Sequence, residues 1–475
     1  MPAILRPLPG LLAVLLATPP MFPLHAQAPP APAPTLAEDP VLQTLLHEAR
    51  SHNPDLARSE ALLQAERERI SQAGALPDPT LSLGLQNDGF KRLEVGRMET
   101  SFYSVTASQG LPWPGKRAIR KDIAQLGSEA AQAASRRAQL SLEAEIKRSY
   151  LALLLARDQL RLLEAQERFL GQAQALAKTR YEVGQGSQAD LLRTQLARTR
   201  LAQTRLSLES EEHLVLSALN HMRTMDSDMA LETPSTLERL PDPVVTPMET
   251  WEAKAEHESP ELQAADLGRR QAERGLDLAK LERRPDFAVS AGVMPRGSLD
   301  PMWSVGVSIT VPLWSRTKQQ RSVAEQEWRL KAGDSELGSI HHRLSERIHE
   351  RSTRLASALA SLRLYREGLL VQSEATFQAT LAQYEAGRVP LLSVLEALQG
   401  WIADRSGLLQ AQAQAHTLQI ALEEMSLGPT PSLGSAALSA AAMGSSSTIP
   451  SASATRATSK SDTGGSDGAP AMGSM

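Results

Sequence analysis

The sequence predicts a mainly α-helical protein with a β-barrel part. Three observations support this fold class: one very long helix, pairs of alternating strands and an internal duplication. The long helix is expected from about Lys116 to Tyr181, a stretch without proline that is rich in strong helix formers. At 1.5 Å per residue such a helix is roughly 100 Å long, more than the diameter of one globular domain. An elongated molecule is therefore expected.

This helix is predicted to be one arm of an antiparallel helical hairpin over residues 115–225. It ends at a short turn between Glu182 and Ser187, and a second periodic run follows at once. Apolar residues recur every seven positions in the return helix, which is the spacing of a coiled-coil seam. They are Leu201, Leu208, Val215 and Met222.

The composition excludes several classes of protein. Of the 475 residues, 41% are hydrophobic and 22% are charged, which argues against a disordered chain. The net charge of −4 gives no basic surface for nucleic acid. The absence of cysteine excludes disulfides, thiolate metal sites and a lipid on an N-terminal cysteine.

The two ends of the chain are expected to lie outside the folded part. Residues 1–28 have the pattern of a signal peptide, with Arg6 before an apolar core and Ala26-Gln27-Ala28 as the cleavage site. Residues 29–40 form a proline-alanine spacer, and residues 428–475 form a Ser/Ala/Gly-rich tail that is predicted to be disordered. No other stretch approaches ~20 apolar residues, so no inner-membrane helix is expected.

Two strands are predicted before the long helix, at residues 80–87 and 101–109. In both, apolar residues alternate strictly with small polar residues, which gives a strand one apolar face and one water-facing face. The apolar positions include Leu81, Leu83, Leu85, Tyr103, Val105 and Ala107.

The whole arrangement then repeats at an offset of about 200 residues, which indicates an internal duplication. Leu76-Pro77-Asp78 returns as Arg284-Pro285-Asp286, and Leu111-Pro112-Trp113 returns as Val311-Pro312-Leu313-Trp314. The turn Tyr181-Glu182-Val183-Gly184 returns as Tyr384-Glu385-Ala386-Gly387. The predicted units are a first repeat at 41–225, a linker at 226–247 and a second repeat at 248–427. The second repeat has strands at 286–294 and 303–311, and a helical hairpin at 315–427 with Ile348, Leu355, Leu362 and Leu369 as its seam.

Four strands of this length cannot close a membrane barrel, because the outer edges of the sheet would be unpaired in lipid. A homotrimer supplies twelve strands, an even number as such barrels usually have. Leu83, Val105, Val289 and Val307 are expected to face lipid. The alternative is a soluble coiled-coil protein with a small β-sandwich cap. The water-facing positions carry no charge, which favours the barrel.

The duplicated pattern resembles the TolC-type outer-membrane efflux factors over roughly residues 41–427. The resemblance rests on Gln109-Gly110-Leu111-Pro112-Trp113-Pro114-Gly115-Lys116-Arg117, on Arg284-Pro285-Asp286-Phe287, on Met302-Trp303-Ser304-Val305 and on the two tips Tyr181-x-x-Gly184 and Tyr384-x-x-Gly387. The Pro-Trp-Pro-Gly-Lys and Met-Trp-Ser segments are most similar to the heavy-metal branch of that family. This branch implies a proton-driven inner-membrane pump of the RND type and a periplasmic adaptor, or membrane fusion protein, as partners.

The sequence contains no catalytic motif, so an enzyme is not expected and no cofactor is predicted. His342, Glu346 and His349 lie on one helix face at positions i, i+4 and i+7, a spacing that could bind a divalent metal. The competing interpretation is a solvated polar face on a charged helix.

The resemblance implies roles for residues at the hairpin tips. By position, Asp190 and Tyr384 match residues that link neighbouring hairpins in the closed periplasmic gate, with Arg388 beside them. Glu396 matches an innermost ring of acidic groups. Helix capping is an alternative role for Asp190, and a surface carboxylate is the alternative for Glu396. The turns that contain Gly184, Ser187, Gly387 and Pro390 are expected to dock the adaptor.

The sequence thus predicts a passive trimeric channel in the outer membrane of a Gram-negative cell, with a large periplasmic helical extension. It is expected to belong to a tripartite efflux system that exports heavy-metal cations. Drugs or a secreted protein are alternative cargoes. An envelope scaffold that transports nothing is the alternative from a different class.

Overall fold

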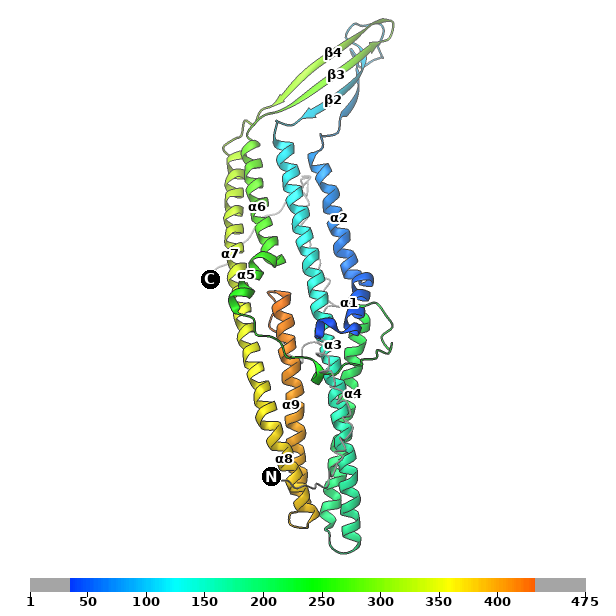
Figure 1. Ribbon diagram of the computed structural model, residues 1–475. Helices are drawn as coiled ribbons and strands as arrows, with labels where there is room; N and C mark the ends of the chain where they lie inside the picture. Colours follow the sequence, from blue (N-terminus) through cyan, green and yellow to red (C-terminus); the bar gives the residue numbers. More distant parts are fainter. Residues whose placement is uncertain (1–34, 432–475) are drawn as a thin grey trace, which may run out of the picture.

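Two long helical hairpins extend in the same direction from a β-sheet at one end of the molecule, as Figure 1 shows for the computed structural model. The structure describes residues 35–431. The predicted signal peptide, residues 29–34 of the spacer and residues 432–475 of the tail lie outside the described residues. The predicted fold class is confirmed, because the described chain is mainly helical, duplicated and contains four strands.

The first repeat begins with a short helix and ends with the longest hairpin of the described chain. Its elements are η1 (Leu36–Glu38), α1 (Pro40–His52), α2 (Pro54–Gly74), β1 (Thr80–Gln86), β2 (Phe102–Leu111), α3 (Lys116–Glu182) and α4 (Gln188–Met222). Side-chain caps set the helix starts. Asp39 accepts hydrogen bonds at the start of α1, and Asn53 does so at the start of α2.

The second repeat follows the same order. Its elements are η2 (Leu237–Arg239), α5 (Met248–Glu258), α6 (Pro260–Leu281), β3 (Asp286–Arg296), β4 (Leu299–Thr310), α7 (Gln319–Leu364), the π-helical segment η3 (Tyr365–Leu369), α8 (Leu370–Glu385) and α9 (Leu391–Glu424). Among the helices of residues 35–431, none is both long and apolar enough to cross a membrane.

The four strands form one antiparallel sheet in the order β1-β2-β3-β4. The pairing keeps the two faces separate. Leu83 is opposite Val105 and Val289 is opposite Val307, so the four positions predicted to face lipid share the apolar face. On the other face, Thr106 is opposite Ser82 on one side and Gly292 on the other. The pairing between β2 and β3 joins the two repeats, whereas β1 and β4 are the outer edges.

Two predicted starts of elements in the second repeat differ from the structure. Strand β4 begins at Leu299, four residues before the predicted start, because it pairs with the whole of β3 up to Arg296. Helix α7 begins at Gln319, not at residue 315, because residues 313–318 form consecutive turns after the proline at position 312.

The predicted seam of the second hairpin is wrong at its last position. Ile348, Leu355 and Leu362 are buried, but Leu369 is 44% exposed. Leu369 ends the π-helical segment, and a π turn places one extra residue in the helix. The following residues are rotated relative to the heptad pattern, and Leu370 packs against the core in place of Leu369.

Three apolar clusters hold the helices together. One lies where α1, α3, α4 and α9 meet the linker, a second joins α6, α7 and α9, and a third lies near the hairpin tips. Arginines also fix the end of α9. Arg351 is 1% exposed and donates to the carbonyl oxygen of Ala421 at 2.7 Å, and Arg148 pairs with Glu424 at 2.7 Å.

Candidate functional site

The two hairpins end in turns of the same geometry, at the end of the molecule opposite the sheet (Figure 1). Gly184 has φ +74° and donates its N–H to the carbonyl oxygen of Tyr181 at 3.0 Å. Gly387 has φ +73° and donates to the carbonyl oxygen of Tyr384 at 2.9 Å. A positive φ is readily adopted only by glycine, which explains why glycine occupies both positions.

The residues predicted to dock a partner lie on the outside of these turns. Gly184, Ser187, Gly387 and Pro390 are all exposed. Ser187 also caps α4, because its hydroxyl oxygen accepts the N–H of Asp190 at 3.2 Å. Pro390 occupies the cap position of α9 without a side-chain hydrogen bond. Both turns are therefore accessible to a partner.

Tyr384 joins the two hairpins within the chain. Its side chain is 5% exposed and packs in the third apolar cluster, between residues of α3 and α9. The guanidinium carbon of Arg180 lies 4.5 Å from the centre of the tyrosine ring. Arg180 also donates to the carbonyl oxygens of Tyr384 and Glu385 at 3.2 and 3.3 Å. Arg180 is thus the polar link between the tip of the first hairpin and the tip of the second.

Asp190 does not contact Tyr384 within one chain. Its carboxylate accepts a hydrogen bond from Arg193 on the same helix at 3.3 Å, and its N–H binds Ser187. Within the chain, the partner of Tyr384 is Arg180, so the bond expected between Asp190 and Tyr384 is not formed there. The observed contacts of Asp190 are those of a first-turn acid in a capped helix.

Arg388 and Glu396 are exposed near the second tip. Within residues 35–431, neither side chain has a hydrogen-bond or ion-pair partner. Glu396 lies on α9 beside the buried Leu395 and points away from the apolar cluster that holds the tips together. A free carboxylate in this position can attract cations.

Aromatic side chains pack the two tips firmly. Phe169 of α3 meets Phe377 of α8 edge-on with ring centres 5.1 Å apart. Phe377 stacks on Trp401 of α9 at 5.7 Å. Such pairs contribute stability beyond the burial of their area. The two hairpins are therefore also in contact about two helical turns from Tyr384, on the side toward the sheet.

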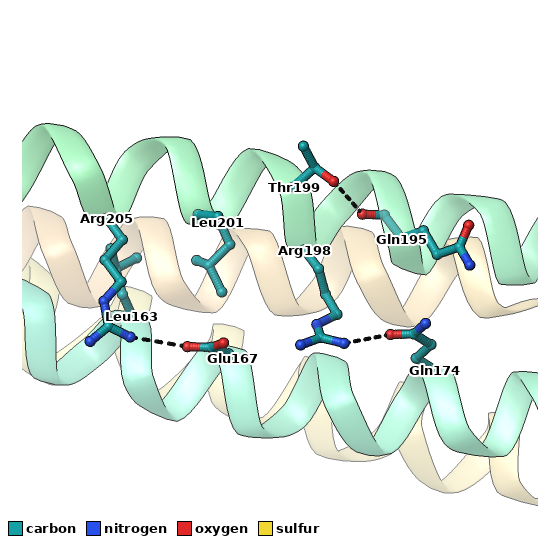
Figure 2. Close-up of a pocket in the computed structure, with 9 residues that line it drawn as sticks. Leu163, Glu167, Gln174, Gln195, Arg198, Thr199, Leu201 and Arg205 are labelled. Atoms are coloured by element: carbon teal, nitrogen blue, oxygen red, sulfur yellow. Dashed lines mark hydrogen bonds and ion pairs between the residues drawn. The ribbon is translucent and has the colours of Figure 1, made fainter.

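An open groove follows the first hairpin between α3 and α4 (Figure 2). Polar side chains cross it. Arg205 of α4 pairs with Glu167 of α3 at 3.2 Å, and Arg198 donates to Gln174 at 2.8 Å. Leu163 and Leu201 also line it, and Figure 2 shows Leu201 between the two polar pairs. The groove is open to solvent and crossed by polar side chains, so it suits contact with another helix better than a small ligand.

The candidate metal ligands do not form a site. In the part of the chain that the structure describes, no three His, Asp or Glu side chains form a group that could hold a metal ion. His342, Glu346 and His349 are all exposed. His349 lies 3.2 Å from the sulfur of Met248 through its Nδ1 atom. This helix face is a solvated polar surface.

Sequence reasoning missed Arg180, although a signal was present. The two tips repeat Tyr181 as Tyr384, but the residue before each tyrosine differs: Arg180 in the first repeat and Gln383 in the second.

Comparison with known proteins gives a family match over both repeats. The sequence profile of the family described as "Outer membrane efflux protein" matches residues 45–226 and 251–426. The gap between the two matched ranges, residues 227–250, covers most of the linker and the first residues of α5.

Individual proteins with similar sequences, and one with a similar structure, are consistent with this family match. The chain is 28% identical to the nickel and cobalt resistance protein CnrC of Cupriavidus metallidurans, over 64% of this chain and 71% of that protein. It is 26% identical to the cobalt-zinc-cadmium resistance protein CzcC of the same organism, over 75% of this chain and 82% of that protein. The crystal structure of the outer membrane protein VceC from Vibrio cholerae has the same fold, with a TM-score of 0.70 and 17% identity over 83% of this chain and 97% of that one.

Proposed function

Because this chain belongs to the outer membrane efflux protein family, we propose that three copies of it form one passive conduit for metal cations. The protein is an efflux channel of the outer membrane with a large helical extension into the periplasm, and it is not an enzyme. The number of copies, the cargo, the gate and the partners are our proposals.

The unpaired edges of the sheet are the evidence for a trimer. In one chain, β1 and β4 each have a strand on one side only. Unpaired backbone groups are very costly in hydrocarbon, so lipid-exposed sheet edges do not occur in membranes. Three copies close a barrel of twelve strands. The face that carries Ser82, Thr106 and Gly292 then lines a water-filled lumen, and the face that carries Leu83 and Val307 contacts lipid.

The length of the hairpins supports a conduit that crosses the periplasm. Helix α3 has 67 residues and therefore extends roughly 100 Å. It follows β2 with a connection of only four residues, so a tube of helices continues the lumen of the barrel. The hairpin tips are the part of the chain farthest from the sheet (Figure 1). With the sheet in the outer membrane, they are the part of each copy farthest from that membrane.

We place the gate at these tips. The contact between Arg180 and Tyr384 keeps the two hairpins of each chain together. Asp190 and Arg388 lie near the same level and are available for contacts with a neighbouring copy. Glu396, repeated three times around the axis, would concentrate cations at the narrowest point.

The proposed cargo is a divalent metal cation such as nickel, cobalt, zinc or cadmium. The single observation behind this proposal is that CnrC and CzcC, whose names describe resistance to these metals, are among the relatives. Between the charged ends Asp286 and Arg296 of β3, the lumen face carries small polar residues that do not distinguish one cargo from another, so selection must come from the partners. We propose that these partners are an RND-type pump in the inner membrane and a periplasmic adaptor that docks on the turns at Gly184, Ser187, Gly387 and Pro390.

Deletion of the gene and complementation test this function. The deletion strain should become sensitive to at least one of the four metals but not to a panel of antibiotics, and the plasmid-borne gene should restore resistance. The purified protein should run as a heat-resistant trimer and conduct ions in planar bilayers. Antibiotic sensitivity alone would make the cargo a drug, and a soluble monomer without conductance would contradict the channel itself.

A further inference from the structure

The junction between the two repeats is fastened by a set of contacts at the helical end of the sheet. Asp286, at the start of β3, accepts the backbone N–H of Trp113 at 2.7 Å and the ammonium group of Lys116 at 2.8 Å. The Trp113 ring stacks on Phe287 with centres 5.7 Å apart. Lys116 is 2% exposed and also donates to the carbonyl oxygen of Arg284. These contacts fasten β2 of the first repeat to β3 of the second.

The internal duplication places the same parts at the two free edges of the sheet. Asp78 is the equivalent of Asp286, and it precedes the edge strand β1. Trp314 is the counterpart of Trp113 after the edge strand β4, although it lies two residues after the proline where Trp113 lies one. Lys318 follows Trp314 by four residues, whereas Lys116 follows Trp113 by three. Each chain therefore carries a carboxylate acceptor at one edge of the sheet and a tryptophan with a lysine at the other edge. Two neighbouring copies can bring these groups together.

These edge residues have no partners within residues 35–431. The carboxylate of Asp78, the backbone N–H of Trp314 and the ammonium group of Lys318 make no hydrogen bond or ion pair there. All three residues are exposed, and the Trp314 side chain is 75% exposed. At the internal junction, by contrast, the equivalent aspartate and tryptophan are both engaged.

We propose that Asp78 of one copy binds Trp314 and Lys318 of the next copy, and that this contact repeats the internal fastening at each seam of the trimer. The inference rests on the proposed trimer and specifies which residues meet where two neighbouring copies join. The carboxylate of Asp78 accepts the Trp314 N–H and pairs with the Lys318 ammonium group. The Trp314 ring packs on Pro79, which is the equivalent of Phe287.

The same equivalence fixes the register of the seam. Within the chain, Leu111 is opposite Phe287 in the β2–β3 pair. The equivalent positions are Val311 and Pro79, so β4 and β1 of neighbouring copies should pair Ile309 with Leu81 and Val307 with Leu83. This register places apolar residues opposite apolar residues along the seam. A shift by one residue would bring the apolar positions of one strand opposite the serines and glycines of the other.

Cysteine crosslinking tests the register, because the chain has no cysteine of its own. Ser308 and Ser82 should lie directly opposite each other on the water-facing side, with Cβ atoms ≈ 4.5–5.5 Å apart. The double variant Ser308→Cys with Ser82→Cys should give covalent dimers and trimers on gels without reductant. The matched control is Ser308→Cys with Thr80→Cys. That pair is two residues out of register, where Cα atoms lie too far apart for a disulfide.

Charge reversal tests the fastening itself. Asp78→Lys and Lys318→Asp should each lower the temperature at which the detergent-resistant trimer dissociates, and the double variant should recover most of that loss. If the double variant is no better than the singles, the pair is not formed.

The crosslinking outcomes separate this inference from the proposed function. Crosslinks in the control pair alone would overturn the register and still show a trimer. Monomers without crosslinks in either pair would contradict the trimeric assembly as well.

Discussion

The guanidinium group of Arg180 covers the ring of Tyr384, with 4.5 Å between the guanidinium carbon and the ring centre. This contact joins residues 204 positions apart and brings the tips of two hairpins together. It gives each chain a link between its hairpins at the level where we place the gate.

Removal of this link should loosen the closed end of the tube. A cation over a tyrosine ring and its accompanying hydrogen bonds contribute about 1–3 kcal/mol, so Arg180→Ala should raise single-channel conductance in planar bilayers. Arg205→Ala is the matched control, because Arg205 pairs with glutamates of its own hairpin and is 43% exposed. It should conduct like the parent.

Tyr384→Phe distinguishes this link from the bond expected between Asp190 and Tyr384 of neighbouring hairpins. Phenylalanine keeps the ring under Arg180 and removes only the hydroxyl group. Conductance should therefore stay at the parental level in Tyr384→Phe alone, and an increase on adding Asp190→Ala would show that the Asp190 carboxylate contacts a neighbouring copy at the gate. An increase in Tyr384→Phe with no change in Arg180→Ala would assign the latch to the tyrosine hydroxyl group.

Much of the fold follows from local pattern, and the exceptions have physical causes. The strand at 80–87 was predictable because one of its faces must be apolar along its whole length, which enforces strict alternation. Leu369 was misplaced because one extra residue in a π turn leaves no mark on the heptad pattern before it. The partner of Tyr384 depends on how two hairpins meet in space, and the spacing of residues in one hairpin carries no information about the other.

Glu396 should govern ion selectivity and not closure. Its carboxylate is exposed and has no partner within the described chain, so Glu396→Gln should leave conductance nearly unchanged. The same substitution should reduce cation-over-anion permeability and weaken block by trivalent cations, both measured from reversal potentials and current traces. Glu374→Gln on α8 removes another exposed carboxylate and should alter neither property. Unchanged selectivity in Glu396→Gln would make Glu396 an ordinary surface residue.

The two faces of β4 should respond differently to charge. Val307 is 67% exposed on the apolar face, and its neighbour Ser308 lies on the opposite face. An arginine at the midplane of a membrane barrel costs roughly 2–4 kcal/mol on the lipid side. Val307→Arg should therefore reduce the amount of trimer in outer-membrane fractions, while Ser308→Arg should be tolerated. Equal losses in both variants would contradict the assignment of the faces.

The turn at Ser187 should contact the adaptor. Ser187 is exposed in the turn between α3 and α4. This turn is the end of the first hairpin that lies farthest from the sheet. Ser187→Cys should form a disulfide with cysteines introduced into the adaptor hairpin in cells. Asn87→Cys, placed in the loop at the other end of the molecule, should not. Crosslinks from position 87 alone would reverse the proposed orientation of the protein in the envelope.

His416 should make the helical part sensitive to acid. It lies on α9, is 4% exposed, and its Nε2 atom is buried without a hydrogen-bond partner. Burial lowers the pKa of His416 to about 4, against a smaller opposing effect of Asp242. Between about pH 6.5 and 4 the unfolded chain therefore binds a proton that the folded chain does not. The stability is fully present above pH 6.5 and falls by up to about 3 kcal/mol per chain as the pH drops toward 4.

The variant His416→Leu isolates this effect from the carboxylates that titrate in the same range. Leucine suits the apolar surroundings and binds no proton, so the melting temperature of the variant should fall less between pH 6.5 and 4 than that of the parent. His257→Leu replaces an exposed histidine and should follow the parent curve. Thermal melts followed by circular dichroism across this range provide the measurement. If parent and His416→Leu lose stability in parallel, the side chain of His416 reaches water in the folded protein, and its burial does not limit protonation.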